Sequence, residues 1–538
     1  MFFPIVPENR RKSNPRYGPL CPPDAENFPD GVLAIWADGW YNGETVYRKR
    51  IAAYGGGRKA LMAKEIDWGF YLRPDASTTL WQQMGLVLRL SIPAILAEIT
   101  SIAMQYIDAA MVGSLGANAT AAIGLVSTTT WLFGGICVSA AAGFSVQIAQ
   151  LIGAGRKEEA QSVVRQGLLA GLAIGLLMGC LGAGISSGLP RWLHGAADVC
   201  PDASRYFLIY ACALPFSLLR QTSGSMLQCS GDMRTPSILN ILLCVEDVVF
   251  NSLLIFPART AVVMGRTLSL PGAGLGVTGA ALGTALSEVV TAVLMTCFLC
   301  FRSPVLRLVK GIPWRLERKC LHTAARLALP MAAERIVLGG AHVAYTRIVA
   351  PMGTIAVAAD SLAVTAESFC YMPGYGIGSA ATTLVGQSIG AGRKDLSKRF
   401  AYLSTARGMG IMAFTGVLMF LLAPWMFSLL TPDPAIRELG AYVLRIEAFA
   451  EPLFAASIVV AGALRGAGDT LAPSILDLVS LWGVRLTAAS LLAPRFGLPG
   501  VWAAMCGELC VRGILFLVWL VKGKWLNKKT AMVEGEKG

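Results

Sequence analysis

Two acidic residues and one amide lie inside apolar stretches where a charge is costly. Asp108 is embedded in MQYIDAAMV, and Asp247 and Asn251 occur together in CVEDVVFNSLLIF. The spacing of four places the last two on one face of a helix. A charge at the centre of a transmembrane helix costs roughly 2.5 to 3.5 kcal/mol, so each acid is a candidate for a functional site.

These residue types can bind a small cation in two ways. Carboxylate and amide oxygens suit a hard ion such as Na⁺. Two carboxyl groups in one apolar pocket instead favour binding of a proton, because their like charges repel. The sequence leaves Na⁺ and H⁺ open, and it predicts no other metal and no cofactor.

The helices that must position these residues are membrane spans. The chain has 538 residues, of which 54% are hydrophobic and only 15% are charged. A spanning helix needs about 20 mostly apolar residues, and residues 86–521 supply about twelve such runs. We therefore predict an all-α membrane protein with twelve transmembrane helices.

The net charge of +13 follows the connections between the apolar runs. Lys and Arg concentrate at 156–165, 302–326, 393–399 and 522–529, which all fall on one side when twelve spans are threaded. By the positive-inside rule that side is cytoplasmic. We expect a multi-pass protein of the inner membrane with both termini in the cytoplasm, and no nucleic-acid partner.

The same pattern suggests the domain organisation. Residues 1–80 are rich in Pro and read as a cytoplasmic, disordered tail, with translation from Met62 as an alternative. We expect an N-lobe at 86–301, a basic linker at 302–326, a C-lobe at 327–521 and a cytoplasmic tail at 522–538.

The two lobes are copies of one repeat. The word IGAGRK occurs at 152–157 and again at 389–394, each copy preceded two residues earlier by Gln150 or Gln387. The offset of 237 residues also pairs Pro93 with Pro330, and it fails only after an insertion before Gly276. Six spans per repeat leave the halves parallel, which predicts two six-helix bundles related by a pseudo-two-fold along the membrane normal and alternating access by rocking.

Longer words in the second half point to a family. ESFCYMPGYGIGSAATTLVGQSIGAGR at 367–393 and GALRGAGDT at 462–470 resemble the MATE family of multidrug and toxic compound extrusion transporters. The resemblance implies a monomeric antiporter in membrane lipid that exports small organic cations or aromatic drugs in exchange for Na⁺ or H⁺. A lipid-linked saccharide flippase of the same superfamily is the alternative, and it would need a markedly cationic cavity. An enzyme would need a nucleophile next to a base, and the sequence does not suggest such a pair.

The resemblance also implies site residues. Asp108 matches the first-helix aspartate of the family. Family members have Asn at the position of Asp247 and Asp at the position of Asn251, so the two residue types are exchanged in this chain. Thr284 and Gln221 resemble neighbours of the cation site.

In the C-lobe, Glu334 and Glu451 lie within a turn of family acids, and Glu367 sits in a matching word; all three could take part in coupling. Both signs are present in comparable number there, so mutual pairing, including Glu367 with Arg347, is the simpler prediction. The charged residues concerned are Glu334, Arg335, Arg347, Asp360, Glu367, Arg445, Glu447, Glu451, Asp477 and Arg485.

Overall fold

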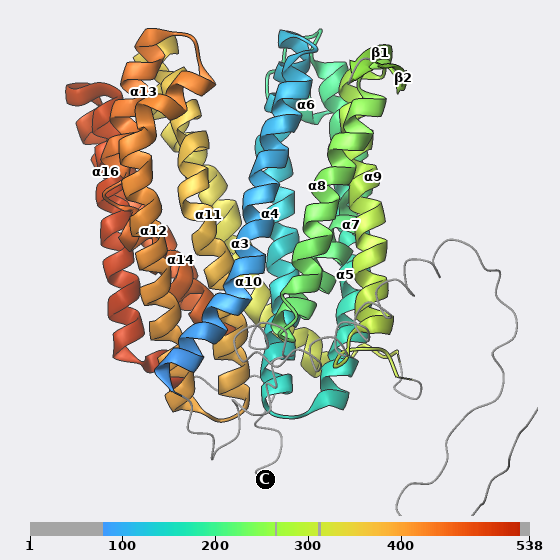
Figure 1. The fold of residues 1–538 in the computed structure, drawn as a ribbon, viewed down its shortest axis with the longest axis vertical. Coiled ribbons are helices and arrows are strands. Elements are labelled where there is room, and N and C mark those ends of the chain that lie inside the picture. Colours follow the sequence, from blue (N-terminus) through green and yellow to red (C-terminus); the bar gives the residue numbers. More distant parts are fainter. Residues whose placement is uncertain (1–78, 264–265, 310–313, 528–538) are drawn as a thin grey trace, which may run out of the picture. The chain divides into compact units, whose positions relative to one another are not determined.

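The computed structural model describes residues 79–263, 266–309 and 314–527, and these are almost entirely helical. Most of the predicted N-terminal tail and residues 528–538 of the predicted C-terminal tail lie outside the described residues. Figure 1 shows the long helices as two bundles, α3 to α9 and α10 to α16, which are called the N-lobe and the C-lobe below.

The N-lobe begins at a capping box, in which Thr79 and Gln82 bond each other's backbone N–H groups at the start of the first helix. The tight turn between the second and third helices depends on Gly155, whose φ of 75° favours glycine. The helices are α3 (Leu80–Gly113), α4 (Ala117–Gly153), α5 (Lys157–Ile185), α6 (Leu189–Trp192), α7 (Cys200–Cys229), α8 (Arg234–Leu254) and α9 (Gly276–Cys297), which continues as a π-turn to Arg302.

The insertion that the repeat predicts before Gly276 is present and forms a β-hairpin. Strand β1 (Pro257–Val263) pairs antiparallel with β2 (Arg266–Ala273). Only its position was predicted from the sequence; the strand pairing was not.

The C-lobe repeats this order with two interruptions. Its helices are α10 (Arg318–Val349), α11 (Thr354–Gly390), α12 (Lys394–Leu430), α13 (Pro434–Glu447), α14 (Glu451–Gly466), α15 (Leu471–Ser480), a π-turn (Leu481–Leu486) and α16 (Thr487–Lys522). The first interruption is the end of one helix, α13, shortly before the next, α14, begins. The second is a sharp turn within α16 at Gly497, where φ is 61°.

The twelve predicted spans are confirmed once these interruptions are considered. Within the described ranges, nine helical stretches are long and apolar enough to cross a membrane. One of them, Leu471–Lys522, has 52 residues and turns at Gly497, so it supplies two crossings. The remaining two are α7, which is more polar, and the broken pair α13 and α14.

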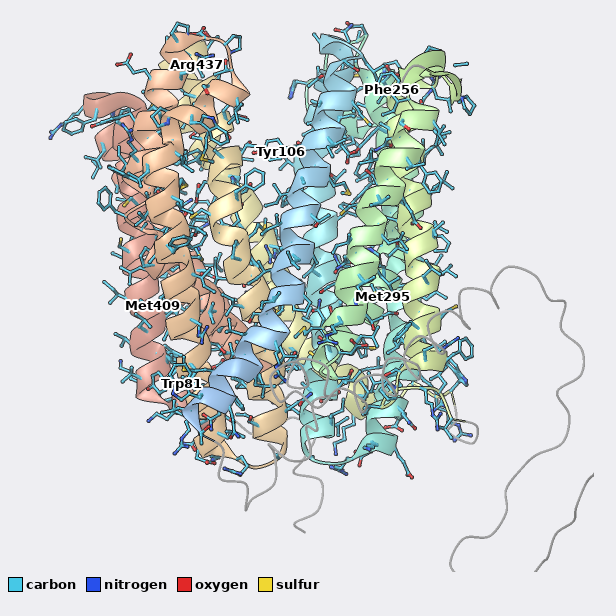
Figure 2. The ribbon with its side chains drawn as sticks, viewed as in Figure 1. Trp81, Tyr106, Phe256, Met295, Met409 and Arg437 are labelled. Carbon is cyan, nitrogen blue, oxygen red and sulfur yellow. The ribbon has the colours of Figure 1, made fainter. Side chains whose placement is uncertain are left out.

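The lobes meet along α3, α4, α10 and α11. In Figure 2, Tyr106 points from α3 toward α11, and its ring stacks on Phe369 at 5.4 Å between centroids. Two glycines permit close backbone approach elsewhere along the contact: a Cβ at Gly143 would lie 2.6 Å from the Ala324 carbonyl oxygen, and one at Gly376 would lie 2.7 Å from the Ile95 nitrogen.

The contact between the lobes is tightest where the two IGAGRK words lie. We call this part of the contact the seam. Gln150 donates its side-chain amide to the Gly466 carbonyl oxygen at 3.2 Å, and Gln387 donates to the Cys229 carbonyl oxygen at 2.9 Å. Since Gln150 and Gln387, and likewise Cys229 and Gly466, are 237 residues apart, the two bonds are related by the repeat.

Glycines and two further hydrogen bonds complete the seam. A Cβ at Gly153 would lie 1.9 Å from the Gln387 carbonyl oxygen, and a Cβ at Gly390 would lie 1.9 Å from that of Gln150. Thr383 also donates to the Gln228 carbonyl oxygen, and Gln147 to that of Cys320. The seam therefore holds the lobes together at this end.

Candidate functional site

Three polar side chains of the N-lobe meet in one cluster. The side-chain nitrogen of Asn251 donates to Asp108 Oδ1 and to Asp247 Oδ2, at 3.0 Å in each case. Asp247 and Asn251 are buried in α8, and Asp108 reaches them from α3, where it is half-buried. One amide thus bridges two carboxyl groups that come from different helices.

Helix α9 completes this cluster. The Ser287 hydroxyl donates to Asp247 Oδ1 at 3.2 Å. Gly283, one turn earlier, is required for the close approach of α8, because a Cβ there would lie only 2.1 Å from Asn251 Oδ1. That oxygen is buried and has no hydrogen-bond partner among the described residues. This unpartnered amide oxygen and the two neighbouring carboxyl groups are oxygen ligands that together could coordinate Na⁺.

Thr284 and Gln221, the two neighbours suggested by the family resemblance, lie on different helices. Thr284 lies on α9 three residues before Ser287, which donates to the Thr284 carbonyl oxygen. Gln221 lies on α7, and no hydrogen bond joins it to the cluster in the described part of the chain. Sequence reasoning missed Ser287, although its spacing of four from Gly283 and three from Thr284 puts it on the same side of α9.

A partly buried ion pair of the N-lobe was also missed. Arg220 makes two contacts with Glu288, Nε to Oε2 at 2.7 Å and the other at 3.0 Å, and a third with Asn240 at 3.1 Å. It ties α7 to α8 and α9, so the charges of this pair are neutralised locally. Nearby, Thr291 donates to Glu246 at 3.3 Å.

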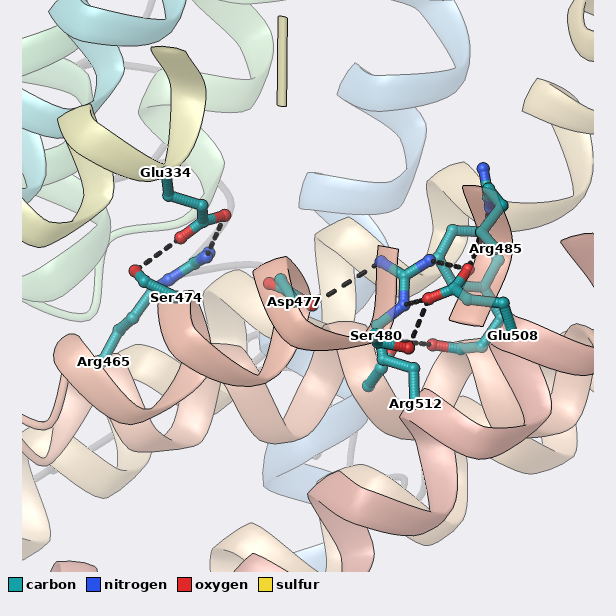
Figure 3. A network of polar contacts seen from close by, with 10 residues as sticks. Glu334, Arg465, Ser474, Asp477, Ser480, Arg485, Glu508 and Arg512 are labelled. Carbon is teal, nitrogen blue, oxygen red and sulfur yellow. Dashed lines mark hydrogen bonds and ion pairs between the residues drawn. The ribbon is translucent and has the colours of Figure 1, made fainter. Parts of the chain in front are cut away.

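The C-lobe holds an extended ion-pair network (Figure 3). Glu508, fully buried, is contacted by Arg485 and Arg512 at 2.9 Å and accepts from Ser480 at 2.6 Å. Arg512 also lies 3.5 Å from Asp477. Asp477 and Arg485 are therefore paired as expected, but with Arg512 and Glu508, which the sequence analysis did not name.

Glu334 forms a second, separate set of contacts in the same region (Figure 3). It accepts a hydrogen bond from Ser474 at 2.6 Å and lies 3.7 Å from Arg465. Its charge is therefore partly compensated within the C-lobe.

Mutual pairing was the wrong expectation for a second group of acids in the C-lobe. Glu447 and Glu451 are 0% exposed, and none of their four carboxyl oxygens has a hydrogen-bond partner among the described residues. Glu367 is also buried, and within the described ranges it forms no ion pair with Arg347. The physical reason is that these acids point into the packed interior, whereas Arg347 is exposed on α10.

The repeat mate of Asp108 has an acidic partner of its own. Tyr345 donates its hydroxyl to Asp360 Oδ1 at 2.8 Å, and Trp502 donates its indole N–H to the same oxygen at 2.8 Å. Tyr345 lies on α10 at the repeat position of Asp108, whereas Asp360 lies on α11, so this contact does not repeat the one that Asp108 makes with α8. In the C-lobe, two uncharged donors, a hydroxyl and an indole N–H, thus bond one carboxylate oxygen.

A cavity of about 170 Å³ lies beside the ion-pair network, between α10, α11 and α14 to α16. Its wall combines aromatic rings, hydroxyl groups and charges of both signs. The charged lining residues are Glu334, Arg335, Arg465, Asp477 and Arg512.

Two lobes of six spans each, built on a repeat and carrying buried acids at membrane depth, define a multi-pass membrane carrier. The chain belongs to the MatE family, whose model matches residues 93–253 and 330–489. The two matched segments fall one in each lobe, so the family match reproduces the internal repeat.

Curated relatives cover most of the chain. A probable multidrug resistance protein NorM from Thermotoga maritima is 27% identical over 457 residues, which are 84% of this chain and 94% of the relative. A probable multidrug resistance protein NorM from Idiomarina loihiensis is 27% identical over 448 residues, 80% of this chain and 93% of the relative.

Solved structures share the fold. An outward-facing multidrug resistance MATE family transporter of the MOP superfamily matches with a TM-score of 0.77 at 20% identity, covering 83% of this chain and 97% of that one. A MOP superfamily transporter from Pyrococcus furiosus, whose binding pocket is described as reversed in polarity, matches with a TM-score of 0.76 at 20% identity, covering 87% and 100%. Both support the arrangement of two six-helix bundles.

Proposed function

We propose that the chain is a secondary active multidrug efflux antiporter that exports organic, cationic compounds in exchange for Na⁺ or H⁺. The observation that carries this proposal is the cluster of Asp108, Asp247 and Asn251, which joins α3 to α8 inside the N-lobe of a MatE-family chain. The names of the NorM relatives support multidrug compounds as the cargo.

Coupling requires that the cluster change when the cation leaves. The Asn251 amide bridges Asp108 and Asp247 and offsets part of their repulsion. A bound cation would take the place of that amide between the two carboxyl groups. Because α3 contacts both the rest of the N-lobe and α11, a change at Asp108 reaches the contact between the lobes.

Alternating access follows from the seam. In the structure the lobes are held together at the end that carries the two IGAGRK words. We place that end in the cytoplasm of an inner-membrane protein, because the Lys and Arg residues concentrate in its connections. The lobes would then rock about their shared contact and expose the cargo to each side in turn.

The acids of the C-lobe form a second candidate for coupling. Glu447 and Glu451 are buried without partners, and a carboxylate in that state is costly unless it binds a proton or a cation. Glu334 is less suited, since Ser474 and Arg465 already contact it.

The flippase alternative has weaker support. The cavity of the C-lobe is lined by three arginines and two acids, a mixed set rather than a markedly cationic one. No enzymatic activity is proposed, and the chain is expected to work as a monomer in membrane lipid.

The test is dye export from cells or proteoliposomes with wild type and Asp108→Asn. The substitution keeps an oxygen that accepts from Asn251 and removes the charge, so export should fall at least tenfold while the protein remains folded. Glu158→Gln, an exposed acid at the start of α5, is the matched control and should export normally. Unchanged export by Asp108→Asn would remove this residue from the mechanism.

The coupling ion is identified by repeating wild-type export with and without Na⁺ at fixed pH, and with and without a pH gradient at fixed Na⁺. Failure of wild type to export any cationic dye under either gradient would overturn the proposed function.

A further inference from the structure

Arg335 differs from the other arginines of the C-lobe cavity. Arg465 lies near Glu334, and Arg512 contacts Asp477 and Glu508. Arg335 lines the same cavity, yet in the described part of the chain it has no ion pair and no hydrogen bond. A lone guanidinium at membrane depth is costly, and such groups mark functional sites unless they are paired.

The fold makes room for this side chain. Arg335 is half-buried on α10, and its aliphatic portion passes over Gly135 of α4, in the other lobe. A Cβ at Gly135 would lie 3.1 Å from the Cδ atom of Arg335, so a larger residue there would crowd it. The guanidinium is thus held at the cavity, next to the contact between the lobes.

The charges around the cavity do not cancel. Its lining contains three arginines and two acids, and each of the two acids already has an arginine within 4.0 Å. Glu508 lies behind the lining and is occupied by Arg485 and Arg512. Among the charged residues that line the cavity, Arg335 is therefore the one that has no ion pair within the described residues.

The rest of the wall suits an aromatic ligand. Tyr375 and Phe454 line the cavity together with the hydroxyl-bearing residues Ser379 and Ser457. Tyr375 is 40% exposed, so its ring is accessible. Aromatic faces bind flat apolar rings, and a guanidinium pairs with a carboxylate through two parallel hydrogen bonds.

We propose that Arg335 binds a carboxylate, or another singly charged acidic group, on an aromatic cargo molecule. The inference rests on the proposed function, because it assumes that the ligand is a molecule that the protein exports. It assigns the acidic group to the C-lobe, whereas the acids around Asp108 lie in the N-lobe.

The test compares two probes that differ in one group: a rhodamine with a free carboxylate and its ethyl ester. Binding to the purified full-length protein in lipid nanodiscs is measured by fluorescence anisotropy. Wild type should bind the acid more tightly than the ester. Arg335→Gln should weaken binding of the acid about 10- to 100-fold and leave the ester within twofold, as expected for loss of a charged, two-point hydrogen bond.

Two variants control for charge and folding. Arg347→Gln removes an exposed positive charge from the same helix and should change neither affinity. Arg335→Lys keeps the charge but not the planar fork, so its affinity for the acid should be intermediate. Equal loss for acid and ester in Arg335→Gln, or no loss for either, would refute the carboxylate site.

Binding and export separate the two proposals. Selective loss of acid binding together with no export of either dye by wild type would leave the carboxylate site standing and overturn the proposed function. Normal export of the ester by wild type together with unchanged acid binding in Arg335→Gln would leave the proposed function standing and overturn the carboxylate site.

Discussion

The seam between the lobes can be weakened without touching the candidate cation site. Gln150→Ala combined with Gln387→Ala removes the two repeat-related hydrogen bonds to the Gly466 and Cys229 carbonyl oxygens. We expect this double variant to spend more time with the lobes separated at the end that carries the IGAGRK words.

The size of the effect follows from the two lost bonds. A neutral hydrogen bond of this kind contributes about 1 kcal/mol, so the pair contributes about 2 kcal/mol to the closed seam. Since 1.4 kcal/mol corresponds to a factor of ten, the ratio of closed to open molecules should fall about 30-fold. The single variants should each give roughly a fivefold change if the bonds act independently.

Amide hydrogen exchange read by mass spectrometry is the appropriate assay, because it needs no labelled cysteine in a chain with thirteen native ones. Peptides covering 150–156 and 387–393 should exchange faster in the double variant. Gln161→Ala is the control, since Gln161 donates to the Val305 carbonyl oxygen outside the seam. Unchanged exchange at both turns would show that these bonds do not hold the seam closed.

Two further predictions concern packing and buried charge. Gly283→Ala places a Cβ 2.1 Å from Asn251 Oδ1, so it should displace that amide and reduce ion-coupled export at least tenfold, whereas Gly124→Ala, where nothing lies within 4 Å, should export normally. Glu508→Ala leaves its two arginine partners buried without their shared carboxylate and should destabilise the protein by about 3 to 5 kcal/mol, seen as a lower midpoint of thermal unfolding in detergent. An unchanged midpoint would contradict the buried network.

The sequence was most informative where the repeat or helical spacing applies. The spacing of Asp247 and Asn251 predicts a shared helix face, and in the structure the two side chains are hydrogen-bonded to each other. The constant offset of 237 residues predicts two equivalent halves, which the fold and the family match confirm. Spacing within one helix and similarity between two segments are both local properties that a single sequence displays.

Contacts between helices could not be read in the same way. Both signs of charge occur along the C-lobe, but only the packing decides that Arg485 reaches Glu508 while Glu447 and Glu451 remain without partners. The hydrogen bond from Tyr345 to Asp360 likewise joins residues of two helices that no periodicity connects. The β-hairpin depends on strand pairing within an insertion that has no counterpart in the other half.

The seam has the form of an interface between two identical subunits, although one chain supplies both sides. Each half presents a glutamine donor, a carbonyl acceptor and a glycine, and each group meets its complement in the other half. This is the self-complementary pattern of a two-fold symmetric dimer. A substitution on either copy breaks that match, so the seam constrains both halves alike, whereas the acids around Asp108 lie off the axis and are free to differ from their counterparts around Tyr345. Symmetry is retained at the two glutamine bonds and their glycines and lost around Asp108 and Tyr345.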